Sequence, residues 1–216
     1  LVVLTCVRVI LLRDALRTER PVSLASVVGG PSLGTKMIVG EDLDPIGTLG
    51  DDHLDEVVAR DALGQLESGL TARRHYGAHG EARQDDVSVF IESFARPPRM
   101  IIFGAVDFTA ALARTAKILG YHVTVCDARP TFTTPRRFPS ADQVIVDWPD
   151  RYLAEVGPGL GPLDAICVLT HDHKFDVPAI AGSVRTRVGY LGAMGSRRTN
   201  EQRVERLRDV GLTDAE

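Results

Sequence analysis

The chain has 216 residues, 44% of them hydrophobic and 25% charged, and a formal net charge of −4. This charge argues against general nucleic-acid binding, which depends on a basic surface, and no apolar run approaches the ~18 residues of a membrane span. We therefore expect a globular cytoplasmic protein of one or two domains, with no nucleic acid and no membrane span.

The clearest boundary is the pair Pro97-Pro98, because consecutive prolines continue neither a helix nor a central strand. We divide the chain there into residues 1–96 and 97–216. The first part is expected to be a smaller α+β domain in which helices cover a sheet. Its predicted elements are a helix near Val9–Arg17, strands at Val22–Val28 and Lys36–Val39, a helix at Asp52–Ser68 that starts after an Asp pair suited to N-capping, and a strand at Val87–Phe94.

The second part alternates apolar strands with helices as βαβ units do, which favours an α/β fold: a Rossmann-like, doubly wound parallel sheet. Its first helix is predicted to turn Phe108, Leu112, Ala116 and Leu119 inward. The predicted strands are Met100–Phe103, Tyr121–Cys126, Val144–Val146, Ala165–Leu169 and Val188–Leu191, and the predicted helices are Asp107–Leu119, Pro149–Val156, Asp176–Val184 and Thr199–Val210.

Two further features concern the chain as a whole. Cys126 and Cys167 fall inside apolar strands, which indicates buried thiols rather than a disulfide framework. The chain begins without Met and stops just after a predicted helix, so we expect one or both ends, the second domain included, to be incomplete.

Gly104 opens the first strand-to-helix turn, where a dinucleotide fingerprint has Gly-x-Gly-x-x-Gly. The other two glycine positions hold Val106 and Thr109, which narrow the channel for a pyrophosphate and disfavour NAD(P) or FAD. Gly104 then serves to turn the chain, and Asp107 to cap the helix. The second strand ends at Asp127, followed by Arg129, at the position from which a carboxylate binds a ribose. A turn-forming Asp is the alternative.

Thr170-His171-Asp172-His173 follows the fourth strand. In an extended segment His171 and His173 would point the same way, so they could bind a cation such as Zn²⁺, although no third ligand stands at a defined spacing. A proton-handling or hydrogen-bonding role for one imidazole is favoured over a metal site. The structural alternative is a polar loop in which Asp176 caps the next helix.

The segment after the fifth strand predicts an anion site. Gly192 and Gly195 allow the backbone to pass close to a ligand, Ser196 can cap the next helix, and Arg197 and Arg198 stand at its positively polarised N-terminus. The alternative is a solvated basic helix face. We assign that alternative to the later arginines Arg203, Arg206 and Arg208.

Several phrases together resemble the XdhC/CoxI family over nearly the whole chain. They are Gly34-Thr35-Lys36-Met37-Ile38-Val39, Gly47-Thr48-Leu49-Gly50, Val125-Cys126-Asp127-Ala128-Arg129-Pro130, Thr170-His171-Asp172-His173 and the segment from Tyr190 to Arg198. The resemblance implies an accessory factor for molybdenum hydroxylases such as xanthine dehydrogenase and carbon monoxide dehydrogenase. Such factors are described as binding molybdenum cofactor (molybdopterin), assisting its sulfuration and delivering it to the apoenzyme. A small N-terminal domain and a Rossmann-like C-terminal domain are also implied.

The chain departs from the family at two cysteine phrases. Many members carry Gly-Cys just after the turn that matches Gly47 to Gly50, where this chain has Asp51-Asp52-His53. Near the second phrase it has Gln84-Asp85-Asp86. A carboxylate does not replace a thiolate as a soft ligand, so a cysteine-dependent step is in question.

Our main hypothesis is a maturation factor, rather than a turnover enzyme, that holds molybdenum cofactor. Ser196 and Arg197 would meet its phosphate, Asp127 a polar edge, and His171 or His173 its reactive end. A hydroxylase apoenzyme and a cysteine desulfurase are the expected partners, and a homodimer is left open. The alternatives are an NAD(P)-dependent oxidoreductase with His171 or His173 as proton donor, and a ligand-free scaffold for a hydroxylase.

Overall fold

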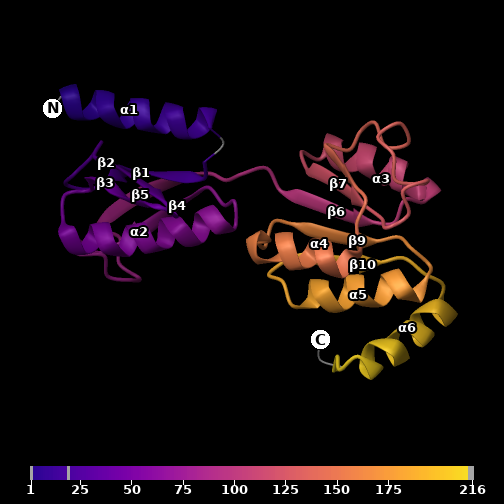
Figure 1. Cartoon of the computed structure of the whole chain (residues 1–216). Coiled ribbons are helices and arrows are strands. Elements are labelled where there is room, and N and C mark those ends of the chain that lie inside the picture. Colours follow the sequence, from indigo (N-terminus) through magenta and orange to yellow (C-terminus); the bar gives the residue numbers. More distant parts are fainter. Residues whose placement is uncertain (1, 19, 214–216) are drawn as a thin grey trace. The chain divides into compact units, whose positions relative to one another are not determined.

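The computed structural model describes residues 2–18 and 20–213. The chain divides into two compact units, Leu1–Arg96 and Pro97–Glu216 (Figure 1). No helix among the described residues is long and apolar enough to cross a membrane.

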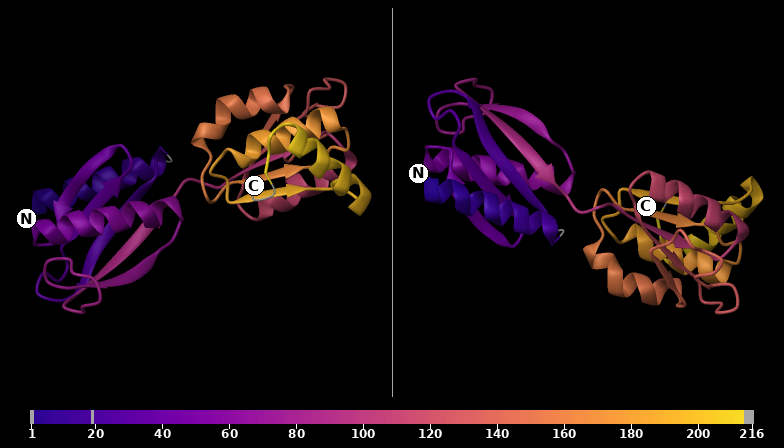
Figure 2. Two further views of the ribbon diagram at one scale, coloured as in Figure 1. Left: turned by 90° about the horizontal axis from the view of Figure 1, so that it is seen from below. Right: turned by 90° about the horizontal axis from the view of Figure 1, so that it is seen from above.

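The first unit is an antiparallel five-stranded sheet with a helix on each face (Figures 1 and 2). Successive residues of the strand Lys36–Gly40 point to opposite faces of the sheet. Met37 and Val39 pack in the cluster that includes residues of α2, and Ile38 packs in the cluster that includes Ala15 of α1. The strand order is β3-β2-β1-β5-β4. The elements are α1 (Val2–Arg17), β1 (Val22–Gly29), β2 (Lys36–Gly40), β3 (Leu43–Thr48), α2 (Asp52–Glu67), β4 (Ala72–Tyr76) and β5 (Val87–Phe94).

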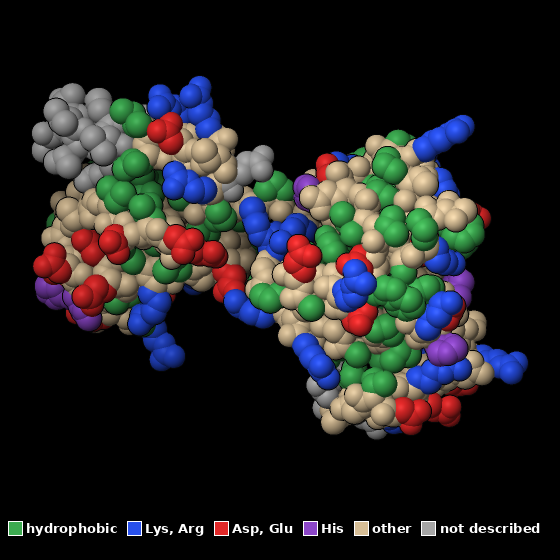
Figure 3. Space-filling model, viewed as in Figure 1, with side chains coloured by type: hydrophobic (Ala, Val, Ile, Leu, Met, Phe, Trp, Pro, Cys, Tyr) green, Lys and Arg blue, Asp and Glu red, His purple; other side chains and the backbone are tan. Residues whose placement is uncertain are grey.

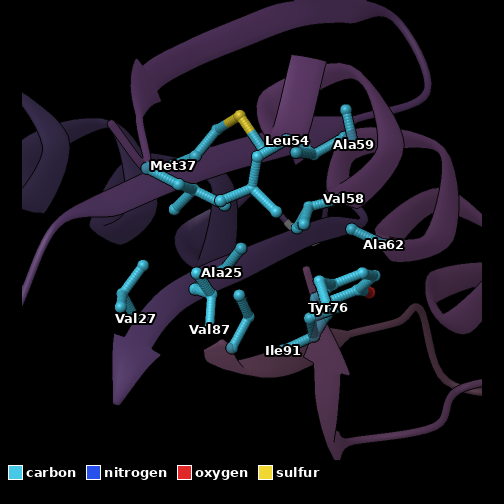
Figure 4. Close-up of a cluster of buried hydrophobic side chains, with 13 residues drawn as sticks. Ala25, Val27, Met37, Leu54, Val58, Ala59, Ala62, Tyr76, Val87 and Ile91 are labelled. Atoms are coloured by element: carbon cyan, nitrogen blue, oxygen red, sulfur yellow. The ribbon is translucent and has the colours of Figure 1, made fainter. Parts of the chain in front are cut away.

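The core of this unit forms where α2 meets the sheet. Leu54 and Val58 of α2 pack among Met37, Ala25 and Ile91, all of them buried (Figure 4). The α2 N-terminus is fixed as predicted, because the Asp51 carboxylate accepts hydrogen bonds from the N–H groups of His53 and Leu54.

The two edge strands, β3 and β4, were not predicted. The sequence of β4, Ala-Arg-Arg-His-Tyr, is polar and mostly exposed. The sequence of β3 contains Pro45 and Gly47. Edge strands often carry charges and proline, which protect their open edge from pairing with other chains, so the hydrophobic pattern that identifies a central strand is missing.

The second unit is a parallel five-stranded sheet in the order β10-β9-β6-β7-β8, which confirms the Rossmann-like prediction. Figure 2 shows helices on both faces of this sheet. Met100 and Ile102 pack on the side of α3, while Ile101 and Phe103 pack on the side of α4 and α5. The elements are β6 (Arg99–Phe103), α3 (Asp107–Ile118), β7 (His122–Cys126), β8 (Gln143–Ile145), α4 (Pro149–Val156), the short 3₁₀ helix η1 (Gly157–Gly159), β9 (Ala165–Val168), α5 (His173–Val184), β10 (Tyr190–Ala193) and α6 (Arg197–Asp209).

The inward side of α3 agrees with the prediction only in part. Ala116 is buried and Leu112 packs against the same cluster, as predicted. Phe108 and Leu119, however, are 63% and 66% exposed, and the other buried residues are Thr109 and Ala113. Small side chains let the helix lie close to the sheet, so the larger apolar residues at its ends remain outside.

Asp176 and Arg203 were both assigned wrongly. Asp172, not Asp176, is the N-cap of α5, because α5 begins earlier than predicted, at His173. Asp176 is buried within α5, and its Oδ2 atom lies 2.8 Å from Nη2 of Arg203, which is 5% exposed rather than solvated. The guanidinium also donates to Met194 O and Asn200 Oδ1. This network offsets part of the cost of burying the two charges, and Oδ1 of Asp176 and Nε of Arg203 have no hydrogen-bond partner.

Replacing Arg203 by Met should destabilise the chain by about 3–5 kcal/mol near pH 7, because a buried carboxylate loses its cation. Burial raises the pKa of Asp176 above its ordinary 3.8, and Arg203 opposes that rise. A raised folded-state pKa favours folding at low pH and loses that effect as the pH rises through it. The deficit of Arg203→Met relative to the natural chain should therefore shrink toward pH 4.

Urea unfolding at pH 7 and pH 4 measures this deficit. Arg206→Met is the control, since Arg206 is exposed on the same helix and its change should stay within about 0.5 kcal/mol. An equal deficit at both pH values would contradict the buried ion pair.

Candidate functional site

The candidate site lies at the carboxyl edge of the parallel sheet. Gly104 follows β6, Asp127 follows β7, Thr170 closely follows β9 and Met194 follows β10. The strand order reverses between β6 and β9, because α3 leaves on one face and α5 on the other. Ligands of open parallel sheets bind outside such a switch point.

Gly104 and Thr170 touch at this switch point. Gly104 has a φ of +119°, and a Cβ on it would stand 2.9 Å from both N and Cγ2 of Thr170. Two backbone hydrogen bonds hold the loops: Gly104 N–H donates to Cys126 O and Leu169 N–H donates to Phe103 O. Glycine is thus required at position 104 by both conformation and space.

The N–H groups of the β6–α3 turn already have partners within the unit. Ala105 N–H donates to Asp127 Oδ2 at 2.8 Å, and Val106 N–H donates to Thr109 Oγ1. The Thr109 hydroxyl donates in turn to Gly104 O. Val106 rather than Asp107 is the N-cap of α3, which corrects the predicted cap. A dinucleotide pyrophosphate would find no free donor among residues 104–106 here.

Asp127 is 3% exposed and organises the loop around it. Besides Ala105, its carboxylate accepts from Arg129 N–H and, at 2.9 and 2.7 Å, from Nε and Nη2 of the same guanidinium. Burial acts to raise the pKa of Asp127, but the Arg129 guanidinium and the two N–H groups hold it below its ordinary value. Direct contact of Asp127 with a ligand stays a prediction.

Aromatic rings surround Arg129, and sequence reasoning missed them. Its guanidinium carbon lies 5.0 Å from the centre of the Phe132 ring and 5.6 Å from that of Phe175. Trp148 packs on Phe175 with ring centres 5.1 Å apart. Arg137 was also missed: its Nη1 atom donates to Ala105 O and Phe132 O. Its position between Pro135 and Pro139, far from any strand end, gave no sequence signal.

The Thr170 to His173 segment is extended at Asp172 and enters α5 at His173, and the common direction of the two histidines stays a prediction. His173 starts α5, and Asp172 accepts from Lys174 N–H as its N-cap. His171 and His173 are exposed. Thr170 is 3% exposed, and its buried Oγ1 atom has no hydrogen-bond partner. No group of three or more His, Cys, Asp or Glu within the described residues could hold a metal ion.

The last segment places its residues at the start of α6. Gly192 lies within β10 beside Cys167, and Gly195 lies in the turn that follows. Ser196 caps α6 as predicted, accepting from Thr199 N–H at 3.2 Å. Arg197 and Arg198 are exposed in the first turn of α6. Arg197 also lines a shallow hollow along α6, together with Asn200, Glu201, Val204, Glu205 and Arg208.

Hydrogen bonds join the loop before α6 to β9 and α5. Met194 N–H donates to Val168 O, and Arg203 binds both Met194 O and Asp176, so the α6 start is tied to β9 and α5. Acidic and basic side chains are interspersed on the face of the second unit that Figure 3 shows. The basic residues at the start of α6 are therefore a local feature.

Gly104→Ala should destabilise the second unit by about 1–3 kcal/mol more than Gly120→Ala. Gly120 has a comparable positive φ of +85°, but nothing lies within 4 Å of a Cβ placed there. The difference in unfolding free energy between the two variants, measured in urea, isolates the contact with Thr170. Equal losses would show that the contact is loose.

Both units of the chain match known protein families in sequence. It matches the XdhC Rossmann domain over residues 100–216 and the XdhC and CoxI family over residues 15–77. It is 32% identical over 143 residues to a probable xanthine dehydrogenase subunit of Bacillus subtilis, covering 59% of this chain and 43% of that protein. It is 24% identical over 208 residues to the uncharacterized protein YqeB of Escherichia coli, covering 90% of this chain and 37% of that protein.

The chain thus spans less than half the length of these two relatives. A crystal structure of a xanthine dehydrogenase from Bacillus halodurans aligns with a TM-score of 0.48 and 18% identity, over 90% of this chain and 84% of that one. The Rossmann-domain match alone covers more than half of the sequence. The chain therefore belongs to the XdhC and CoxI family.

Proposed function

We propose that the chain acts in a cytoplasmic accessory factor for a molybdenum hydroxylase of the xanthine dehydrogenase type, and that its second unit binds molybdenum cofactor during maturation or insertion. Membership of the XdhC and CoxI family supports the accessory role, as does the name of the Bacillus subtilis relative. The proposed partners are the hydroxylase apoenzyme and a cysteine desulfurase that supplies sulfur.

The observation that carries cofactor binding is the unpartnered hydroxyl of Thr170 at the switch point. A buried hydroxyl without a partner costs free energy, and native proteins retain few of them. The N–H groups of Ala105 and Val106 in the neighbouring β6–α3 turn are satisfied within the unit, whereas the Thr170 hydroxyl is not. A polar ligand atom would complete it.

Charge at the same edge fits an anionic ligand. The Arg129 side chain is 38% exposed beside the aromatic rings, and Arg197 and Arg198 stand at the N-terminus of α6. A helix N-terminus with arginines favours a phosphate. We assign the phosphate to Arg197 and Arg198, and the flat pterin to the neighbourhood of Thr170 and Arg129.

The buried cysteines do not fit as ligands of the metal. Burial raises the pKa of Cys126 to about 12 and also raises that of Cys167, so both stay protonated thiols near neutral pH. The bound cofactor would bring its own molybdenum chemistry for the hydroxylase. This chain would bind and orient it through its phosphate and ring.

Histidine–carboxylate pairs occupy the two places where many family members carry cysteine. Asp51 Oδ2 lies 2.7 Å from His79 Nδ1, and Asp85 contacts His75. The Leu54 N–H and then His79 lower the pKa of Asp51. These carboxylates cannot carry persulfide sulfur, so in our proposal sulfur reaches the cofactor from the desulfurase without a relay through these positions.

The NAD(P)-dependent oxidoreductase gains no support from the geometry. Its pyrophosphate would have to displace the hydrogen bonds of Ala105 and Val106. Saturable binding of a nicotinamide dinucleotide to the full chain, with no pterin bound, would favour it over our proposal.

Arg197→Ala should weaken cofactor binding by about 1.5–3 kcal/mol, through loss of a charge-assisted hydrogen bond. The chain is purified from a host that makes molybdenum cofactor, and pterin is released, oxidised to its fluorescent form and quantified per mole of chain. Arg206→Ala is the control, because Arg206 lies on the last turn of the same helix. Equal pterin in both variants would contradict the phosphate assignment, and none in the natural chain would contradict cofactor binding.

Thr170→Val should lower cofactor binding without lowering the stability of the fold. The substitution keeps the shape and removes the unpartnered hydroxyl, so the unfolding free energy should stay the same or rise by about 1 kcal/mol. Pterin content should fall in the same preparation. If pterin is retained in full, Thr170 is not a ligand contact.

A further inference from the structure

Arg129 belongs to a cluster of flat side chains at the carboxyl edge of the parallel sheet. Its guanidinium lies against the rings of Phe132 and Phe175. The Trp148 ring in turn packs on Phe175, with ring centres 5.1 Å apart. These four residues, the aromatic cluster, come from the loop after β7, the start of α4 and the first turn of α5. Segments that are distant in the sequence thus bring flat side chains together at one point of the sheet edge.

Trp148 is held in place by the fold but is only partly covered. It is the N-cap residue of α4, directly before Pro149, and its N–H donates to Asp147 Oδ1 at 2.8 Å. Its ring packs on Phe175, which is 4% exposed, whereas Trp148 itself is 41% exposed. A bound ring would therefore meet an indole whose position is already fixed, which lowers the entropy cost of binding.

Phe132 is less available, although it is exposed to a similar degree. The guanidiniums of both Arg129 and Arg137 lie against its ring, 5.0 and 5.7 Å from the ring centre. Trp148 has a single ring partner within the described residues, which is Phe175. The indole is therefore the ring of the aromatic cluster on which a flat ligand can stack.

Two polar groups in these segments lack a hydrogen-bond partner. Arg129 uses Nε and Nη2 for Asp127, and none of the described residues accepts a hydrogen bond from its Nη1. The buried Thr170 hydroxyl has no partner either. The segment after Thr170 leads directly into the turn of α5 that carries Phe175, whose N–H donates to Asp172 O. A fused heterocycle such as a pterin has oxygen and nitrogen atoms on its edge that such groups can bind.

We propose that Trp148 is the residue on which the flat pterin ring of the cofactor stacks, with Arg129 Nη1 and the Thr170 hydroxyl donating to the edge of that ring. The inference rests on the proposed function and adds the contact that holds the ring. Aromatic and guanidinium planes bind flat heterocycles in many proteins, because stacking needs only a planar face and hydrogen bonds to the edge fix the orientation. An aliphatic ligand would use neither.

The intrinsic fluorescence of the chain tests this contact directly, because Trp148 is its single tryptophan. The full chain is titrated with a hydroxymethylpterin monophosphate, a probe that carries both a pterin ring and a phosphate. The same titration of the chain unfolded in urea corrects for light that the probe absorbs. The probe should quench the tryptophan emission saturably, and inorganic phosphate alone should not. Quenching no greater than in the unfolded chain would overturn the proposal.

Variants made in a host that synthesises molybdenum cofactor give a second readout. Trp148→Leu removes the stacking face, so binding should weaken about tenfold and the pterin that copurifies should fall. Trp148→Phe keeps an aromatic ring and should restore most of it. Phe108→Leu is the matched control, since Phe108 is 63% exposed on α3, outside the aromatic cluster. Urea unfolding checks that the variants fold, and if Trp148→Leu does not, the fluorescence titration of the natural chain decides alone.

The outcomes distinguish this inference from the proposed function. Equal pterin in Trp148→Leu and in the natural chain would overturn the stacking contact and leave cofactor binding standing. A natural chain that carries no pterin would contradict the proposed function, and saturable quenching by the probe would then still support the contact of the ring with Trp148.

Discussion

The contact between Gly104 and Thr170 is the constraint on which the carboxyl edge of the parallel sheet depends. It joins the loops that follow β6 and β9, where the strand order reverses, and it leaves no room for a side chain at position 104. Because the two backbones lie so close, the turn before α3 closes upon itself through Asp127 and Thr109. The two loops therefore pack against each other where a dinucleotide-binding fold has a groove for the pyrophosphate. The buried Thr170 hydroxyl is left without a hydrogen-bond partner.

Two buried carboxylates, each paired with an arginine, hold the segments next to this contact. Asp127 binds the Arg129 guanidinium and holds it among aromatic rings, and Asp176 binds Arg203 and ties the start of α6 to α5. Both carboxylates are nearly inaccessible to water, so each needs its arginine to remain charged inside the unit. The positions of Arg129, Arg197 and Arg198 at the candidate site thus follow from pairs that do not themselves meet a ligand.

Family membership and geometry constrain the function in different ways. The chain belongs to the XdhC and CoxI family and is similar to a probable xanthine dehydrogenase subunit, while the satisfied β6–α3 turn argues against dinucleotide binding in its usual pose. The proposal that reconciles them is a Rossmann-like unit whose anion contacts have moved from the first turn to the last helix.

The sequence by itself determined the element types in the second unit, the parallel α/β class and the helix caps at Asp51 and Ser196, since periodicity and capping are local properties. It placed Leu112 and Ala116 of α3 correctly on the core but not Phe108 and Leu119, and it did not determine the burial of Arg203 or the partners of Asp127. Asp176 and Arg203 stand 27 residues apart, and Ala105 and Asp127 stand 22 apart. Such pairs form only once the sheet has brought distant loops together, so the tertiary structure alone decided which buried polar groups are satisfied and which, like the Thr170 hydroxyl, have no partner.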